Sequence, residues 1–496
     1  MNLLAKPQAN SLSVSHSSLT FILPALAILV PSILTAFKQA QFIHSDIILF
    51  QIMSLHNPTL FYWGQNRLLN VIPFLLQFIT SPKLNMFFVA FSCAASFFVL
   101  LWVISCVSQR IISGGSNKMI TFIIYTFNFL ICICLFVRGC WNETTLSHPE
   151  YSLALNFGIL AVYFFYYFPH KYSIFALVCG FIAIGINPSV ILLFAFFMFF
   201  KCLYMHKISR GDAFLSILMT IFFLVWLAIS MQYGIVETYY DLDFSMILQG
   251  IKSFFTQFIM RYFFSYSLCF IGILFFIFMI VVITSTKLTT AQRKKIIYIS
   301  LTTLVSIFIY ALIISSVPHF HANLCASRYF IFVVFMIIFI MSINFTAYIA
   351  YFINIPNKLF MLFLFIFCCV LPFRFPNDFN IRHANVYKSC DEIIPSGTHV
   401  YAGDYWKIWS CMSRDLIDGY DSRSLGFRSI SDKQNIQKKL RSSSHSGVLD
   451  ISCLNAEIEM CKSQIGDFYS KYNIKEIQQI NPQHINLVID DLVENL

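Results

Sequence analysis

The first long polar loop of this sequence, from Phe37 to Lys83, holds a carboxylate, Asp46, in a setting that suits acid–base chemistry. The loop follows a single apolar segment. An ionisable acid so close to a membrane costs free energy, and its presence therefore suggests a function. His44 and Gln51 lie near Asp46, and the apolar run after it indicates a helix that would shield the carboxyl from water. Such shielding raises the pKa of a carboxyl toward that of a useful general base. A solvated loop acid is the alternative.

Later in the same loop, aromatic, amide and guanidinium side chains follow one another from Tyr62 to Arg67. The ring of Trp63 could pack on the apolar face of a sugar, and the amides of Gln65 and Asn66 could bind its hydroxyl groups. Arg67 could bind a phosphate through two parallel hydrogen bonds. An aromatic belt with an anchoring Arg is the alternative. The run is a candidate substrate-binding segment.

A short second polar loop brings three titratable side chains together, Glu143, His148 and Glu150. We interpret them as a candidate second acid or acceptor-binding cluster, in which either Glu143 or Glu150 could be the acid that matters. Solvated loop residues are the alternative.

Arg328 and Tyr329 open a late apolar segment. A fixed positive charge at that position could hold a lipid-linked phosphate. An Arg that extends to the lipid headgroups as an anchor is the alternative.

The composition indicates that a polytopic membrane protein positions these residues. Of 496 residues, 58 % are hydrophobic and 11 % are charged, and the mean hydropathy is +0.73. The net charge of +10 does not indicate a nucleic-acid partner, because from Phe373 onward 14 Lys and Arg stand against 16 Asp and Glu, which leaves 19 against 7 before it. The basic excess belongs to the membrane part, where short cytoplasmic loops are rich in Lys and Arg.

Apolar stretches predict about eleven transmembrane helices. One long stretch, 173–203, is interrupted by Asn187 and Pro188, and we expect two short helices to meet there. The predicted helices span 19–36, 86–108, 119–137, 152–168, 173–186, 188–203, 213–232, 262–284, 296–316, 329–351 and 359–373.

The distribution of Lys and Arg predicts the orientation of these helices. The cluster Arg293-Lys294-Lys295 is the firmest marker of the cytoplasmic side, and it places the N-terminus on that side. The segments expected on the outer side are 37–83, 138–151, 233–261, 317–328 and the tail after Phe373.

The sequence divides into a membrane domain, 1–373, and a tail, 374–496, of ordinary charge density. Strand-like runs at 399–406, 447–453, 474–480 and 485–489 alternate with helical runs at 432–444 and 456–472, which predicts a small α/β domain. The tail has four cysteines. In an oxidising compartment one or two disulfides are plausible, and Cys390–Cys411 with Cys453–Cys461 is the first choice among three connectivities.

The chain resembles the GT-C superfamily of integral-membrane glycosyltransferases, and within it bacterial proteins of the protein-mannosyltransferase and aminoarabinose-transferase kind. The shared features are the acid of Ser45-Asp46, a first outer loop with interfacial helices followed by Pro73, a polar second outer loop, the Arg328-Tyr329 pair and a C-terminal domain. The second loop departs from the family pattern because it lacks an obvious single Asp. The resemblance implies a GT-C-like α-helical polytopic membrane protein with a small extracytoplasmic α/β domain, located in the bacterial inner membrane.

The resemblance further implies that a sugar passes, with inversion, from a polyprenyl-phosphate donor to a glycan, lipid or protein acceptor at the outer face of the membrane. Asp46 would be the general base, and Arg328 with Arg67 would stabilise the departing lipid phosphate. A lipid donor requires no nucleotide site, in agreement with the absence of Walker and GxGxxG patterns from the sequence. We expect neither a cofactor nor a metal.

Three other classes compete with this interpretation. An O-antigen polymerase or ligase also has many helices, but it usually places its key residues in a large late loop. A flippase or transporter is expected to carry ionisable residues within its spans or an internal repeat, and the spans here are nearly free of charge. A purely structural membrane protein is the third.

Overall fold

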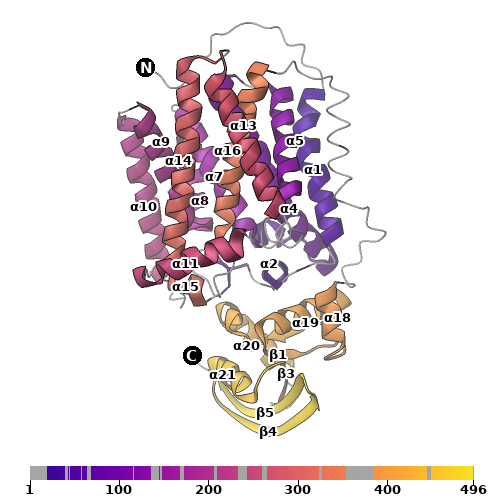
Figure 1. The fold of residues 1–496 in the computed structure, drawn as a ribbon. Helices are drawn as coiled ribbons and strands as arrows, with labels where there is room; N and C mark the ends of the chain where they lie inside the picture. The colour runs from indigo at the N-terminus through magenta and orange to yellow at the C-terminus, as the bar shows by residue number, and fades with distance from the viewer. Residues whose placement is uncertain are drawn as a thin grey trace. The chain divides into compact units, whose positions relative to one another are not determined.

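A computed structural model of the chain describes residues 19–39, 43, 45–56, 58–63, 69–115, 117–135, 145, 148–167, 173–205, 209–232, 243–259, 265–286, 288–322, 327–352, 366, 384–443 and 448–494 (Figure 1). The chain divides into two compact units. The first, which we call the helical unit, comprises Met1–Thr35, Cys93–Ile229 and Thr238–Phe375. The second, which we call the loop–tail unit, comprises Ala36–Ser92, Ser230–Glu237 and Pro376–Leu496.

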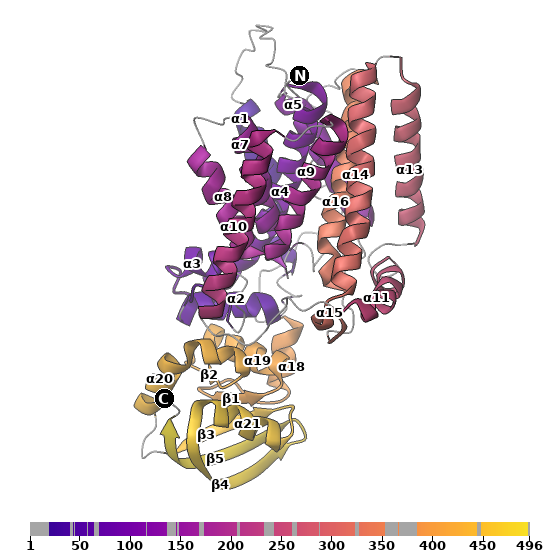
Figure 2. The same cartoon turned by 90° about the vertical axis from the view of Figure 1, so that its left-hand side faces the viewer.

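Long apolar helices build the helical unit and run alongside one another (Figures 1 and 2). Shorter elements connect them, and their bounds are η3 Pro188–Val190, η4 Phe244–Met246, α11 Ile247–Ser253, the π-helix η5 Phe254–Ile259, α15 Pro318–Ala322 and η6 Ser327–Phe330. The long helices are α1 Leu19–Gln39, α4 Pro82–Ser113, α5 Lys118–Leu135, α7 Pro149–Tyr167, α8 Ser173–Ile186, α9 Ile191–Met205, α10 Arg210–Gln232, α13 Ser265–Thr284, α14 Thr290–Ser315 and α16 Ile331–Phe352.

Four of these helices are long and apolar enough to cross a membrane, namely α4, α10, α14 and α16. Helices also form at the other predicted spans within the described residues, namely α1, α5, α7, α8, α9 and α13. The prediction of a helical membrane protein is therefore supported, whereas the count of about eleven transmembrane helices is not confirmed. Of the span expected at 359–373 only residue 366 is described, and the domain boundary after residue 373 lies outside the described residues.

The expected break in the 173–203 stretch is confirmed. Helix α8 ends at Ile186, and the 3-10 turn η3 begins at Pro188. Asn187 lies between them in an extended conformation, and its side-chain oxygen accepts a 3.0 Å hydrogen bond from the backbone N–H of Ser189. Pro188 has no backbone N–H, and the backbone N–H of Ser189 is bonded to the Asn187 side chain. A new helix can therefore start here without leaving these first backbone donors unsatisfied.

Small and polar residues hold the helices of this unit together. A methyl group at Gly185 of α8 would approach the indole ring of Trp226 of α10 to within 2.4 Å, so this ring packs on α8 at a position that favours glycine. Asn128 of α5 is buried and donates hydrogen bonds of 3.0 Å to Ser105 and 3.2 Å to Ser342. Interhelical contacts of these two kinds are typical of membrane helix bundles.

The first polar loop folds as part of the loop–tail unit. Its helices are α2, Ser45–His56, and α3, Val71–Leu76, and it continues into the first turns of α4. Asn70 ties the loop between them, because its Nδ2 donates to the carbonyl oxygens of Thr59 at 3.1 Å and Phe61 at 3.2 Å. Helices were expected in this loop, and they form, with Pro73 inside α3. That the loop belongs to one compact unit with the tail was not expected.

A five-stranded mixed sheet forms the centre of the tail, with strand order β2-β1-β3-β5-β4. Strand β1 is parallel to β2 and β3, while β5 is antiparallel to β3 and β4. The strands are β1 Val400–Gly403, β2 Arg423–Ser424, β3 Leu449–Leu454, β4 Tyr469–Asn481 and β5 His484–Glu494, and the helices are α18 Asn385–Asp391, α19 Tyr405–Asp418, α20 Lys433–Ser443 and α21 Ile458–Phe468.

The prediction that strands and helices alternate in the tail is confirmed for its second half, but it missed the first two helices. The strand expected at 399–406 ends at Gly403, and α19 begins directly after Asp404. Asp404 caps this helix, because its side chain accepts hydrogen bonds of 3.1 Å from the backbone N–H groups of both Trp406 and Lys407. Aromatic residues that are typical of strands therefore start a helix here.

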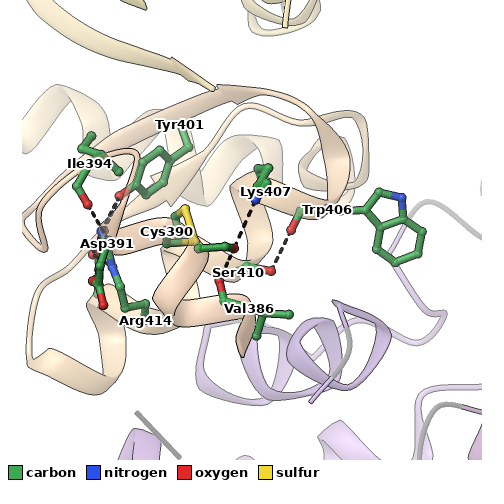
Figure 3. Close-up of a disulfide and its surroundings, with 12 residues drawn as sticks. Val386, Cys390, Asp391, Ile394, Tyr401, Trp406, Lys407, Ser410 and Arg414 are labelled. Atoms are coloured by element: carbon green, nitrogen blue, oxygen red, sulfur yellow. Dashed lines mark hydrogen bonds and ion pairs between the residues drawn. A yellow bond between two sulfur atoms is a disulfide. The ribbon is translucent and has the colours of Figure 1, made fainter. Parts of the chain in front are cut away.

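Both disulfides predicted for the tail are confirmed. Cys390–Cys411 joins α18 to α19 across a Cα–Cα distance of 5.4 Å, and Cys453–Cys461 joins β3 to α21 across 6.1 Å. Figure 3 shows the first disulfide beside the buried Arg414, whose Nη1 donates a 2.6 Å hydrogen bond to the carbonyl oxygen of Ile394. The disulfide and this hydrogen bond fix α18 and the chain after it on α19.

Candidate functional site

In the helical unit, the start of α7 carries two of the predicted site residues in contact. His148 Nδ1 lies 3.1 Å from Glu150 Oε1, and both side chains are largely buried, with exposed fractions of 10 % and 16 %. The first turn of α7 is held in place because Ser152 Oγ donates to the carbonyl oxygen of Pro149 at 3.0 Å. The histidine and the carboxyl can share a proton, or they can together bind a hydroxyl group.

The same end of α7 packs against the start of α16. The ring of Tyr151 meets the ring of Phe332 edge to face, with 5.2 Å between centroids. Tyr310 of α14 packs on the other side of this cluster, 5.7 Å from Phe332, and its hydroxyl donates a 2.7 Å hydrogen bond to the carbonyl oxygen of Tyr329. The predicted second-loop acid and the predicted Arg-Tyr turn are therefore brought to one end of the helical unit.

Arg328 and Tyr329 lie in the 3-10 turn η6 that leads into α16. Tyr329 is 9 % exposed, and its ring meets the ring of Phe320 edge to face at 5.6 Å. The turn is thus embedded among aromatic side chains, which hold its backbone in one position. The side chain of Arg328 lies outside the described part of the chain.

In the loop–tail unit, Asp46 is the second residue of α2. Its side chain lies outside the described part of the structure, as do the residues His44, Gln65, Asn66, Arg67 and Glu143. The structure therefore leaves the roles predicted for these side chains as predictions.

Trp63, predicted to bind a sugar, is only 1 % exposed. Its ring lies 6.2 Å from the ring of Trp409 on α19, and its backbone N–H points to the sulfur of Met53 at 3.4 Å. Trp63 therefore packs the first loop against the tail, and neither face of its ring is open to a ligand in this arrangement.

Helix α2 is fastened at its middle by a buried glutamine. Gln51 is fully buried; its Nε2 donates to the carbonyl oxygen of Pro82 at 2.9 Å, and its Oε1 accepts from Ser413 Oγ at 2.6 Å. Ser413 Oγ also lies 2.8 Å from the hydroxyl of Tyr387, and Ser54 Oγ donates to Asn85 Oδ1 at 2.7 Å. Gln51 is near Asp46 in the sequence, but no sequence pattern indicates that Ser413 of the tail is its partner.

The end of α2 meets the tail through a histidine and an arginine. Arg423 Nη1 lies 3.2 Å from His56 Nε2, and Arg423 also forms an ion pair with Asp421. Burial lowers the pKa of His56 well below its ordinary value of 6.5, and the positive charges of Arg423 and Lys439 lower it further. His56 is therefore neutral at physiological pH, and its Nε2 can accept the hydrogen bond from Arg423.

Among the residues that the structure describes, no group of three or more His, Cys, Asp or Glu side chains could hold a metal ion.

The fold defines a class: a predominantly helical protein with helices suited to crossing a membrane and a small sheet domain near its C-terminus. Neither a scan against models of known protein families nor a search of curated proteins finds a match for this chain.

Proposed function

We propose that this chain is a membrane glycosyltransferase that moves a sugar from a polyprenyl-phosphate donor to an acceptor hydroxyl on the outer face of the membrane. The observation that carries the proposal is the contact between Tyr151 and Phe332, because it joins the Glu150 segment to the Arg328-Tyr329 turn. An acid and an arginine from distant parts of the sequence would then serve one reaction, the acid at the acceptor and the arginine at the donor phosphate.

The chemistry is a single displacement. Asp46 accepts the proton of the acceptor hydroxyl, whose oxygen attacks the anomeric carbon of the sugar. The bond between that carbon and the phosphate oxygen breaks with inversion, and the polyprenyl phosphate leaves with the bonding electrons. Arg328, with Arg67, stabilises the negative charge that develops on the phosphate. Glu150 with His148 would hold the acceptor.

The buried hydrogen bonds that fix helix α2 support the assignment of Asp46 as the base. Asp46 precedes Gln51 on α2, and Gln51 is bonded on one side to the start of α4 and on the other side to α19. A general base must be held at hydrogen-bonding distance from the proton that it removes, so a helix fixed by buried hydrogen bonds suits this role.

The two disulfides support an outer location for the loop–tail unit. Disulfides persist in oxidising compartments such as the bacterial periplasm and are rare in the cytosol. Because the first loop and the tail form one compact unit, we infer that they share a side of the membrane. We therefore propose that the protein lies in a bacterial inner membrane, with this unit in the periplasm.

The test is the substitution Asp46→Asn in a strain that lacks the chromosomal copy of this sequence. Mass spectrometry of surface glycans would compare the deletion strain with strains that express the wild-type and substituted chains. We expect Asp46→Asn to leave the glycan pattern of the deletion strain unchanged while membrane expression is normal.

The matched control is Asp243→Asn, because Asp243 lies in another outer loop and caps a helical turn that an Asn can also cap. It should restore the wild-type glycan pattern. Restoration by Asp46→Asn would refute the base assignment, and a deletion strain with an unchanged glycan pattern would refute the proposed function itself.

A further inference from the structure

The segment from Asp243 to Ile259 is a nearly continuous helix with two different faces. It consists of η4, α11 and the π-helix η5, and its start is capped because Asp243 Oδ1 accepts a 2.9 Å hydrogen bond from the backbone N–H of Ser245. Figure 1 shows α11 running across the end of the long helix α14 instead of alongside it. We call this segment the crossing helix.

One face of the crossing helix packs tightly within the helical unit. A methyl group at Gly250 would lie 2.4 Å from the Cβ of Ser315, so the helix touches the end of α14 at a distance that only glycine allows. Further along, the ring of Phe254 lies 4.8 Å from the buried ring of Phe330. This face is therefore fixed to α14 and to the turn before α16.

The other face exposes large apolar side chains. Phe244 is 70 % exposed, Leu248 81 % and Phe255 57 %. Lys252 is also exposed and lies between Leu248 and Phe255 on the helix. An apolar stripe with a lysine within it is the pattern of a helix that lies in the membrane interface, where the lysine side chain can extend to lipid phosphates.

The apolar stripe continues a surface that already suits lipid. Helix α14 is one of the helices that are long and apolar enough to cross a membrane, and it exposes Leu301, Leu304, Val305, Phe308 and Ile309 at helical spacing. A helix that crosses the end of a transmembrane helix lies in the plane of the membrane surface. Its exposed apolar side chains then meet the boundary between headgroups and acyl chains.

We propose that the crossing helix, residues 243–259, lies in the interface between lipid and water on the outer side of the membrane. Phe244, Leu248 and Phe255 would lie among the acyl chains, and Lys252 would lie at the lipid phosphates. The partner is the lipid surface itself. The proposal does not depend on the glycosyltransferase assignment, but its geometry would bring lipid to the back of the Arg328-Tyr329 turn, because Phe254 packs against Phe330.

The experiment places the photoreactive residue p-benzoylphenylalanine at position 248 or 255 of the full-length chain. The purified protein is reconstituted in vesicles of phosphatidylethanolamine and phosphatidylglycerol and illuminated, and adducts are identified by mass spectrometry. Position 308 on α14 is the positive reference, and position 477 on β4, whose isoleucine is 49 % exposed, is the reference for an exposed apolar site outside the helices.

We expect lipid adducts at positions 248 and 255 at yields close to that of position 308 and several-fold above that of position 477. Lys252→Gln should lower the share of phosphatidylglycerol in the adduct at position 248, because it removes the attraction between the lysine and the anionic lipid. Adducts with protein in place of lipid at positions 248 and 255 would overturn the proposal, and so would lipid yields no greater than at position 477.

Discussion

Ser413 in the tail donates a 2.6 Å hydrogen bond to the side chain of Gln51 in the first loop, although 362 residues separate them in the sequence. Both side chains are buried, and Tyr387 lies next in the same chain of hydroxyl and amide groups. The tail therefore holds the helix that carries Asp46, and the two parts of the loop–tail unit should lose stability together.

The substitution Gln51→Leu tests this connection. It removes the hydrogen bond from Ser413 to Gln51 and the one from Gln51 to the carbonyl oxygen of Pro82, and each lost hydrogen bond costs about 0.5 to 1.5 kcal/mol. We expect a lower melting temperature of the purified protein in detergent. Gln77→Leu is the matched control, because the side chain of Gln77 makes only a local contact with Phe74. Equal melting temperatures for the two variants would contradict the role of Gln51.

The contact between His56 and Arg423 predicts a pH dependence of stability. The pKa of His56 is lowered in the folded protein, so the unfolded chain binds a proton near pH 6.5 while the folded chain does not. Stability is therefore present above the unfolded pKa and is lost as the pH falls below 6.5. We expect the melting temperature to fall between about pH 7.5 and about pH 5.5 in the wild type, and to fall less in His56→Gln.

Glutamine at position 56 can accept the hydrogen bond from Arg423 and does not titrate, so it isolates the effect of protonation. His399→Gln serves as the comparison, because it removes another histidine of the same unit, whose Nε2 lies 3.2 Å from the carbonyl oxygen of Pro395. The substitution keeps the 2.9 Å hydrogen bond that the backbone N–H of Arg423 donates to the backbone carbonyl oxygen of residue 399. An unchanged pH dependence in His56→Gln would show that another group causes it.

The parts of the fold that could be predicted are those determined by local sequence. A long run of apolar residues predicts a helix that is surrounded by lipid or by other helices. Asn187-Pro188 ends a helix because proline has no backbone N–H and the asparagine side chain caps the next turn. Helix α19 was missed because Tyr405 and Trp406 favour a strand by local preference. The cap by Asp404 and the burial of Trp409 favour the helix instead.

The candidate site could be predicted less well, because its contacts join distant residues. A sequence cannot distinguish a tryptophan that binds a sugar from one that is buried, and Trp63 is buried because Trp409 packs against it. Likewise, the residues Tyr151 and Phe332 carry no signal that they meet. Acidic, basic and aromatic residues that could bind or react with a substrate can be recognised in the sequence, but their surroundings depend on the tertiary structure.

The disulfides predict the redox state of the tail in the cell. If the loop–tail unit is periplasmic, membranes isolated in the presence of an alkylating agent should yield the peptide pairs Cys390–Cys411 and Cys453–Cys461 still linked. Free cysteines of the helical unit, such as Cys106 and Cys202, provide the internal comparison because they carry no disulfide. Alkylated tail cysteines in freshly isolated membranes would contradict the outer location.

The larger disulfide loop should contribute more to stability. Cys390–Cys411 encloses a sequence separation of 21 and Cys453–Cys461 one of 8. Loop entropy then predicts losses of about 3.3 and about 2.5 kcal/mol when each pair is replaced by serine. The first replacement also frees α18, which carries Tyr387 beside Ser413, so we expect it to lower the melting temperature more than the second. The opposite order would indicate that α18 stays on α19 without the disulfide.

Glu150→Gln separates a role in the proposed reaction from a role in folding. Glutamine is nearly isosteric with glutamate and can still contact His148, so we expect a melting temperature close to that of the wild type. The loss of the negative charge weakens the hydrogen bond that would hold the acceptor hydroxyl, and a hydrogen bond to a charged group contributes about 1.5 to 3 kcal/mol, so we expect sugar transfer to fall by roughly 10- to 10²-fold. Glu143→Gln is the matched control for the second loop and should retain more transfer. Full transfer by Glu150→Gln, measured with surface glycans as the readout, would remove Glu150 from the site and leave Glu143 as the candidate acid.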